Sequence, residues 1–345
     1  MRAQVLTGIR RMELREVPKP EIQNDNEVLL KINRVGVCGS DVHYYETGRI
    51  GSQVVQYPFR VGHECSATVA EIGGAVSHVK VGQPVIVEPA VSCHQCDQCK
   101  SGRENTCRKL KFLGCPGQLE GCLCDYIVMP QECCFPTQGK LTPDQGVLCE
   151  PFAIGIYAVK QSRMVAGAPV GVLGAGPIGL SCLEAARIIG ARSVYITDKI
   201  DARVKIAHKA GAAWAGNPDR EDIVHSIIQQ EPFGLDVIFE CAGQQAAIDQ
   251  ALDLLRPGGT LMLVGIPRED RISFSIDKMR RKELTVINVR RQNHCPQTAI
   301  DWIASRQAKI DFMVTHHFQF EKTQEAFDLV AGYKDGVVKA MITLD

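Results

Sequence analysis

Residues Val170-Gly-Val-Leu-Gly-Ala-Gly-Pro-Ile-Gly179 decide the fold, because an apolar strand runs here into a glycine turn and then into a helix. Gly174 permits a tight reversal, Gly176 has no Cβ to block a pyrophosphate, and Gly179 lets the helix pack on its strand. The N–H groups at the start of that helix face the phosphates. The stretch therefore predicts a dinucleotide-binding site.

The residues that follow agree with this prediction. Apolar residues recur at helical spacing from Cys182 to Ile189, Gly190 stands where a helix ends, and Ser193–Thr197 is typical of a second strand. Asp198 closes that strand, within a few residues of where a carboxylate meets the adenosine ribose hydroxyls. A plain turn aspartate is the alternative. Because a carboxylate repels a 2′-phosphate, Asp198 predicts NAD rather than NADP.

The whole chain has the length and composition of a globular protein of about two domains. It has 345 residues, 45% of them apolar, and 39 basic residues balance 39 acidic ones. This balance argues against a nucleic acid or an anionic membrane as the main partner. The N-terminal residues lack the apolar core of a signal peptide, and no apolar run is long enough to span a bilayer. We therefore expect a cytoplasmic protein.

Two kinds of secondary-structure pattern divide the chain. Up to about Pro151, short β-branched segments with frequent glycine and proline predict a mostly antiparallel, barrel-like β domain. From Phe152 strands alternate with helices, which predicts a doubly wound parallel sheet of the Rossmann type. The strands expected there are 170–173, 193–197, 213–215, 236–240, 260–264 and 284–288. The tail is too short for a domain of its own, so the predicted domains are 1–152 with 290–345, and 153–289.

The chain contains fifteen cysteines, and four of them form a local cluster. In a reducing compartment the expected uses of cysteine are metal binding, catalysis or burial. Four thiolates can close a tetrahedral shell around zinc, which predicts a structural zinc in the lobe 93–107. An iron–sulfur cluster and a nucleic-acid-binding zinc ribbon are the weaker alternatives. The four are Cys93, Cys96, Cys99 and Cys107.

A second set of metal-binding residue types is dispersed along the chain. Cys38, His63, Glu64 and Glu150 offer a thiolate, an imidazole and carboxylates. Any one of them alone is more often a packed core residue. Together they are the mixed set expected of a catalytic zinc that keeps one position open for substrate.

These motifs resemble those of the zinc-dependent medium-chain alcohol dehydrogenase family, and most of all its sorbitol (polyol) dehydrogenase branch. The resemblance extends over essentially the full length. It implies a Rossmann domain joined to a GroES-like catalytic domain, NAD, two zinc ions per chain and a homo-oligomer, a tetramer or dimer. It rests on Cys38-Gly-Ser-Asp-Val-His-Tyr-Tyr45, Gly48-Arg-Ile-Gly51, Gly62-His-Glu64, the four-cysteine lobe, Glu150-Pro151, the glycine turn and Val314-Thr-His316.

The resemblance also implies residue roles. Cys38 and His63 are the expected zinc ligands, and the third is either Glu64 or Glu150. Asp41 matches the carboxylate that orients the ligating histidine. The expected catalytic residues are Ser40 and His43 of a proton relay and Glu150, and the expected substrate contacts are Tyr44 and Arg290. The expected cofactor contacts are Gly174, Gly176, Ile178, Gly179, Asp198, Arg203, Val264 and Ile266.

The function so implied is the transfer of hydride from a secondary alcohol of a polyol or sugar derivative to NAD, giving the ketose or ketone. One departure bears on the substrate: Arg291 stands where the resemblance leads us to expect an aromatic residue. A guanidinium binds a carboxylate better than a hydroxyl, so a sugar acid is the alternative substrate. A non-catalytic dinucleotide-binding regulator is less compatible with an intact set of metal and relay residues. A zinc-free quinone reductase would lack both cysteine sets.

Overall fold

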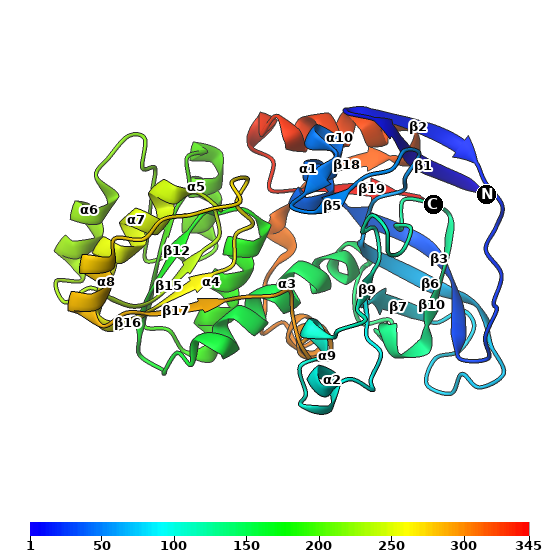
Figure 1. The fold of residues 1–345 in the computed structure, drawn as a ribbon, viewed down its shortest axis with the longest axis horizontal. Coiled ribbons are helices and arrows are strands. Elements are labelled where there is room, and N and C mark those ends of the chain that lie inside the picture. The colour runs from blue at the N-terminus through cyan, green and yellow to red at the C-terminus, as the bar shows by residue number, and fades with distance from the viewer. Residues whose placement is uncertain (345) are drawn as a thin grey trace. The chain divides into compact units, whose positions relative to one another are not determined.

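The computed structural model describes residues 1–344, which form two compact units (Figure 1). The first consists of residues 1–150, 296–305 and 314 onward, and the second of residues 151–295 and 306–313. Residues 151–152, 290–295 and 306–313, predicted for the first domain, group with the second unit. No helix within residues 1–344 is both long enough and apolar enough to cross a membrane.

The second unit is built on a parallel sheet of six strands among the described residues. The strand order is β14-β13-β12-β15-β16-β17, and each neighbouring pair is parallel. This confirms the doubly wound fold. The strands are β12 (Pro169–Leu173), β13 (Ser193–Thr197), β14 (Trp214–Gly216), β15 (Leu235–Glu240), β16 (Leu255–Leu263) and β17 (Thr285–Asn288).

The helices between these strands begin and end at residues suited to those positions. The helix after β12 has Pro177 in its first turn and ends at Gly190, whose φ of 104° lies in the left-handed region. The side chain of Asp222 caps α6 by accepting from the backbone N–H of His225. The helices of this unit are α4 (Pro177–Ile189), α5 (Asp201–Lys209), α6 (Ile223–Gln230), α7 (Gln245–Leu254) and α8 (Ile276–Lys282).

The first unit contains a mixed sheet in which most pairs are antiparallel. Its strand order is β11-β7-β6-β3-β19-β18, with β10 also paired to β3. Among the described residues, β18 and β19 are the only parallel pair in this sheet. The C-terminal strands therefore complete the sheet that the N-terminal residues begin. The strands are β3 (Glu27–Gly36), β6 (Glu64–Ile72), β7 (Pro84–Val87), β10 (Tyr126–Pro130), β11 (Cys134–Pro136), β18 (Val314–Gln319) and β19 (Lys339–Thr343).

Smaller elements surround this sheet. They are β1 (Arg2–Gly8), β2 (Arg11–Glu16), α1 (Gly39–Thr47), β4 (Arg49–Ile50), β5 (Gln53–Val54), β8 (Ala90–Val91), α2 (Asp97–Lys100), η1 (Glu104–Thr106), β9 (Lys111–Phe112), η2 (Gln131–Cys133), α9 (Pro296–Ala304), η4 (Phe320–Lys322), α10 (Thr323–Ala331) and η5 (Lys334–Gly336). Two further elements are α3 (Pro143–Ser162) and η3 (Asp311–Met313).

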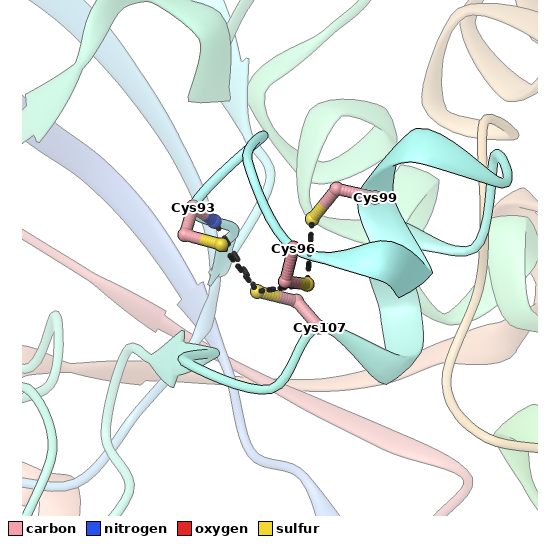
Figure 2. Close-up of side chains that lie close together, drawn as sticks. All are labelled: Cys93, Cys96, Cys99 and Cys107. Carbon is pink, nitrogen blue, oxygen red and sulfur yellow. Dashed lines mark hydrogen bonds between the residues drawn. The ribbon is translucent and has the colours of Figure 1, made fainter.

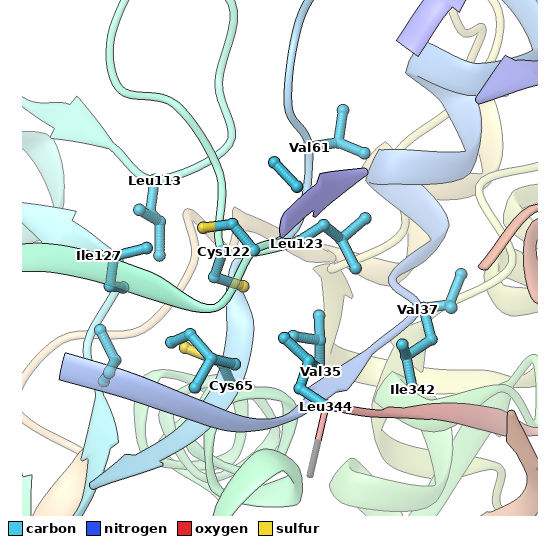
Figure 3. Close-up of a cluster of buried hydrophobic side chains, with 14 of the residues drawn as sticks. Val35, Val37, Val61, Cys65, Leu113, Cys122, Leu123, Ile127, Ile342 and Leu344 are labelled. Carbon is cyan, nitrogen blue, oxygen red and sulfur yellow. The ribbon is translucent and has the colours of Figure 1, made fainter. Parts of the chain in front are cut away.

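The core of the first unit joins residues from both ends of the chain. Val35 and Val37 of the β3 region pack in one buried cluster with Cys65, Leu123 and Ile342 (Figure 3). Because Ile342 lies on β19, the hydrophobic core fixes the C-terminal strand beside β3.

Helix α1 was not predicted from the sequence. It lies inside the β-rich half and carries four of the residues singled out there: Ser40, Asp41, His43 and Tyr44. Its residues include β-branched and aromatic side chains and show no clear amphipathic periodicity, so the usual signal for a helix is missing.

Candidate metal centres and dinucleotide site

Cys38 lies at the junction between β3 and α1. It is the residue before the helix, its φ and ψ of −90° and 147° are extended, and its carbonyl accepts from the N–H of Val42 at 3.1 Å. Cys38 is half-buried, and its Sγ atom accepts a hydrogen bond from Ser40 Oγ at 3.3 Å. The helix start therefore fixes the thiol just beyond the end of β3.

His63 is held by the residue that the sequence analysis assigned to orient it. The Nδ1 atom of His63 lies 3.3 Å from Asp41 Oδ1, and the same oxygen accepts from the N–H of Gly62 at 3.2 Å. Both side chains are buried. Because Nδ1 faces Asp41, the Nε2 atom is the one left to act as a metal ligand.

Glu64 makes a contact that the sequence analysis did not foresee. Its two carboxylate oxygens accept from Lys339 Nζ at 2.8 and 2.6 Å, and the side chains of both residues are 1% exposed. Lys339 also donates to the carbonyl of Val37 at 3.3 Å, next to Cys38. Lys339 belongs to no recognisable sequence motif, so nothing in the sequence indicated that it contacts Glu64.

The sulfur of Cys38, a ring nitrogen of His63 and a carboxylate oxygen of Glu64 all lie within 4.8 Å of one another. This is the donor chemistry of a zinc site with a position open for substrate. The charges of the set favour a cation as well. Burial lowers the pKa of His63, but Asp41 and Cys38 outweigh burial and the net pKa is raised.

Four other residues predicted for this site lie in the first unit. Glu150 is buried on α3, and its charge contributes to a raised pKa of Lys339, although Glu150 does not belong to the close set of Cys38, His63 and Glu64. Ser40 and His43 are half-buried on α1. Tyr44 is buried, and its hydroxyl donates to Gln53 Oε1 at 3.1 Å.

The four cysteines of the lobe converge as a second donor set (Figure 2). The Sγ atom of Cys107 lies 3.4 Å from that of Cys93 and 3.9 Å from that of Cys96, and the Sγ atoms of Cys96 and Cys99 lie 3.6 Å apart. All four sulfurs lie within 4.8 Å of one another, as a tetrahedral zinc site requires. The His94 ring, by contrast, is 55% exposed and lies 4.0 Å from Glu132.

Backbone N–H groups favour the thiolate form of one cysteine in this lobe. Hydrogen bonds from the N–H groups of Arg108 and Cys99 lower the pKa of Cys96 to about 6. Burial and the neighbouring thiols instead raise the pKa of Cys99 to about 12. A bound cation would balance the charge of four converging thiolates, and zinc fits this requirement.

In the second unit, the glycine turn joins β12 to α4. The φ of Gly174 is 106°, which only glycine adopts easily, and a Cβ at Gly179 would lie 1.8 Å from the carbonyl oxygen of Gly174. A Cβ at Gly176 would meet only Arg203 Nη1, at 3.7 Å. The space in front of the helix is thus left for a ligand that approaches the backbone closely.

Asp198 lies at the end of β13, beside this turn. Its oxygens accept from the backbone N–H groups of Ala175 and Ile200, each at 2.8 Å, and Arg203 Nη1 lies 4.0 Å away. Lys199 turns aside and pairs with Asp219 at 3.1 Å. The remaining residues predicted for the cofactor are partly accessible: Ile178 and Val264 are half-buried, and Ile266 is exposed.

Arg290 and Arg291 follow the edge strand β17. Arg290 is exposed, and Arg291 is half-buried with a φ of 54°. On an extended segment the side chains of adjacent residues point to opposite faces, so only one of the two arginines would face a substrate. Because Arg291 is left-handed, that alternation does not apply to it.

Comparison with known families matches both units. Residues 24–139 match the alcohol dehydrogenase GroES-like domain, and residues 177–305 match the zinc-binding dehydrogenase domain. The chain is 35% identical to a sorbitol dehydrogenase of Bacillus subtilis, over 99% of this chain and 97% of that protein.

Solved structures give the same result. The fold matches that of an Escherichia coli oxidoreductase/dehydrogenase of unknown specificity with a TM-score of 0.95 and 30% identity, covering 100% of this chain and 99% of the other. It matches L-idonate 5-dehydrogenase of Escherichia coli with a TM-score of 0.91 and 26% identity, covering 99% and 98%.

Proposed function

Because the chain belongs to the zinc-binding dehydrogenase family with an alcohol dehydrogenase GroES-like domain, we propose that it oxidises a secondary alcohol of a polyol or sugar derivative with NAD. The observation that carries the proposal is the convergence of Cys38, His63 and Glu64 in one unit. The glycine turn and Asp198 of the other unit support the cofactor. The resemblance to a sorbitol dehydrogenase supports the substrate class.

Each group at the metal centre has a proposed task. Bound zinc would act as a Lewis acid on the alcohol oxygen, and the nicotinamide would accept the hydride. Cys38 and His63 hold the metal, with Glu64 or Glu150 as the third ligand, and Asp41 fixes the tautomer of His63. Ser40 and His43 carry the alcohol proton toward solvent, and Tyr44 and Arg290 orient the substrate. The four-cysteine lobe holds a second zinc.

A substrate panel tests the proposal. Polyols, sugar acids and amino alcohols are assayed for NADH formation with the purified protein. We expect turnover to be highest with a polyol or sugar derivative that carries a secondary hydroxyl. Absence of NADH formation with every member, in protein whose metal content is verified, would contradict the function.

Asp198 is expected to make NAD the preferred cofactor. The carboxylate accepts from ribose hydroxyls but repels a 2′-phosphate, and Lys199 pairs with Asp219 instead of offsetting that repulsion. Replacing Asp198 by alanine should shift the ratio of kcat/KM for NADP over NAD by at least about 10-fold toward NADP. Asp219→Ala, which releases the flexible Lys199, should shift the same ratio less. A wild-type preference for NADP would mean that Arg203 and Lys199 outweigh Asp198.

A sugar acid is the second candidate substrate, favoured by Arg291 and by the similarity to L-idonate 5-dehydrogenase. If Arg291 binds the carboxylate, Arg291→Ala should lower kcat/KM for an aldonate by about 10-fold or more and leave the matching polyol almost unchanged. Arg290→Ala is the matched comparison and should lower kcat/KM for both substrates. Equal effects of Arg291→Ala on the two substrates, or none on either, would assign Arg291 to another role.

The proposal includes a cytoplasmic location and a homo-oligomer, a tetramer or dimer. The fifteen cysteines, all within the described residues, are not in disulfides, which supports a reducing compartment. Sedimentation of the purified protein at several concentrations measures the number of subunits.

A further inference from the structure

The buried pair of Lys339 and Glu64 lies directly against the candidate zinc ligands. We propose that Lys339 is a positioning residue of the catalytic metal centre: it holds the Glu64 carboxylate in a two-point contact and competes with the metal for it. The proposal rests on the proposed function, because it requires a metal held by Cys38 and His63.

Three neighbouring strands bring the two residues together. On β3, Gly36 lies opposite Glu64 of β6 on one side and opposite Met341 of β19 on the other. Lys339 lies two residues before Met341 and therefore projects from the same face of the sheet. The register of β6, β3 and β19 thus puts the ammonium group beside the carboxylate, although 275 residues separate them in the chain.

Gly36 clears the path between them. A Cβ at this position would lie 2.5 Å from Glu64 Oε2 and 3.4 Å from Lys339 Cδ. Any side chain here would push the carboxylate or the lysine away. The missing side chain at Gly36 therefore leaves the space through which Lys339 reaches Glu64.

Charge explains what the contact does. The thiolate of Cys38 and the carboxylates of Glu64 and Glu150 would surround a divalent metal with three negative charges, and Lys339 supplies a positive charge to the same buried region. With both carboxylate oxygens directed at the ammonium, less electron density is available to the metal, which stays more electrophilic.

This competition predicts that removal of the lysine slows the release of the metal. Lys339→Met leaves Glu64 without its partner, so the carboxylate binds the metal more strongly. In Co²⁺-substituted protein we expect the visible spectrum of the catalytic site to change and the metal to leave about 10-fold more slowly when EDTA is added. We expect kcat to fall at the same time. A lysine that serves only to stabilise the fold would have the opposite effect, because a loosened site loses its metal faster.

Two matched variants complete the experiment. Lys339→Arg keeps the charge and should restore a spectrum and a dissociation rate near those of the wild type. In a Glu64→Gln background the partner is neutral, so Lys339→Met should change the dissociation rate much less than in the wild type. If Lys339→Met alone does not fold, the variant with both changes, which removes both buried charges, is compared with Glu64→Gln. Nearly equal dissociation rates are expected, and a much faster loss of metal from the variant with both changes would overturn the inference.

The outcomes separate this inference from the proposed function. The difference between the spectra of the wild type and of Cys38→Ala isolates the catalytic site from the four-cysteine lobe. If the wild type and Cys38→Ala carry the same amount of metal, the proposed function fails. If the wild type binds metal there, three results would overturn the inference. Folded Lys339→Met could have the spectrum and the metal dissociation rate of the wild type, or it could lose its metal faster than the wild type. Lys339→Met could also change the dissociation rate equally in the wild-type and Glu64→Gln backgrounds.

Discussion

Replacing Cys38 by alanine is expected to lower kcat by at least about 10³-fold while the protein stays folded. The thiolate is one of the three donors within 4.8 Å of one another, so its loss leaves His63 and Glu64 with an incomplete site. A Lewis acid acting on a reacting oxygen contributes several kcal/mol, and about 4 kcal/mol corresponds to roughly 10³-fold in rate. Cys38 is only half-buried at the start of α1, so its removal creates no large cavity.

The measurement is steady-state kinetics together with zinc content and a thermal melt. Cys149→Ala is the matched control, because Cys149 is buried next to Glu150 but its Sγ donates to the carbonyl of Gln145 at 3.3 Å. We expect that control to lose about 1 kcal/mol of stability and to keep its kcat within about threefold. Cys38→Ala with normal zinc content and more than a tenth of wild-type turnover would refute the role of Cys38.

Replacing Cys99 by alanine should have its largest effect on stability and metal content. The sulfurs of the lobe are held together against mutual repulsion, and apparent binding free energies of structural zinc reach about 10–16 kcal/mol in small domains. We expect the variant to lose one zinc ion and to melt at least about 5 °C below the wild type, because even 2–3 kcal/mol lowers Tm by that amount in a domain of this size.

Elemental analysis and calorimetry measure these two effects. Cys133→Ala is the control, since Cys133 is buried and lies outside the lobe. It should keep two zinc ions per chain and lose much less stability. One zinc per chain in the wild type, unchanged in Cys99→Ala, would mean that the lobe holds no metal.

The sequence by itself determined the features that depend on residues close together in the chain. The glycine turn, its flanking strand and helix, and the alternation of strands and helices in the second unit follow from local spacing, because a turn between adjacent elements has few solutions. The four-cysteine lobe was predicted for the same reason: its ligands span fifteen residues, and a short loop can bring them together without the rest of the fold. The family followed from these motifs and was confirmed by the comparisons.

Only the tertiary structure decided which side chains meet across strands and turns. Lys339 finds Glu64 because β6, β3 and β19 pair in one register and Gly36 leaves a gap, and a shift of one residue would turn each side chain to the other face. Arg291 is half-buried and its backbone is left-handed, which the pattern of neighbouring residues did not indicate. Helix α1 likewise forms where its own sequence gives only a weak signal. Contacts between distant residues depend on the packing of the whole unit, and local propensity does not encode them.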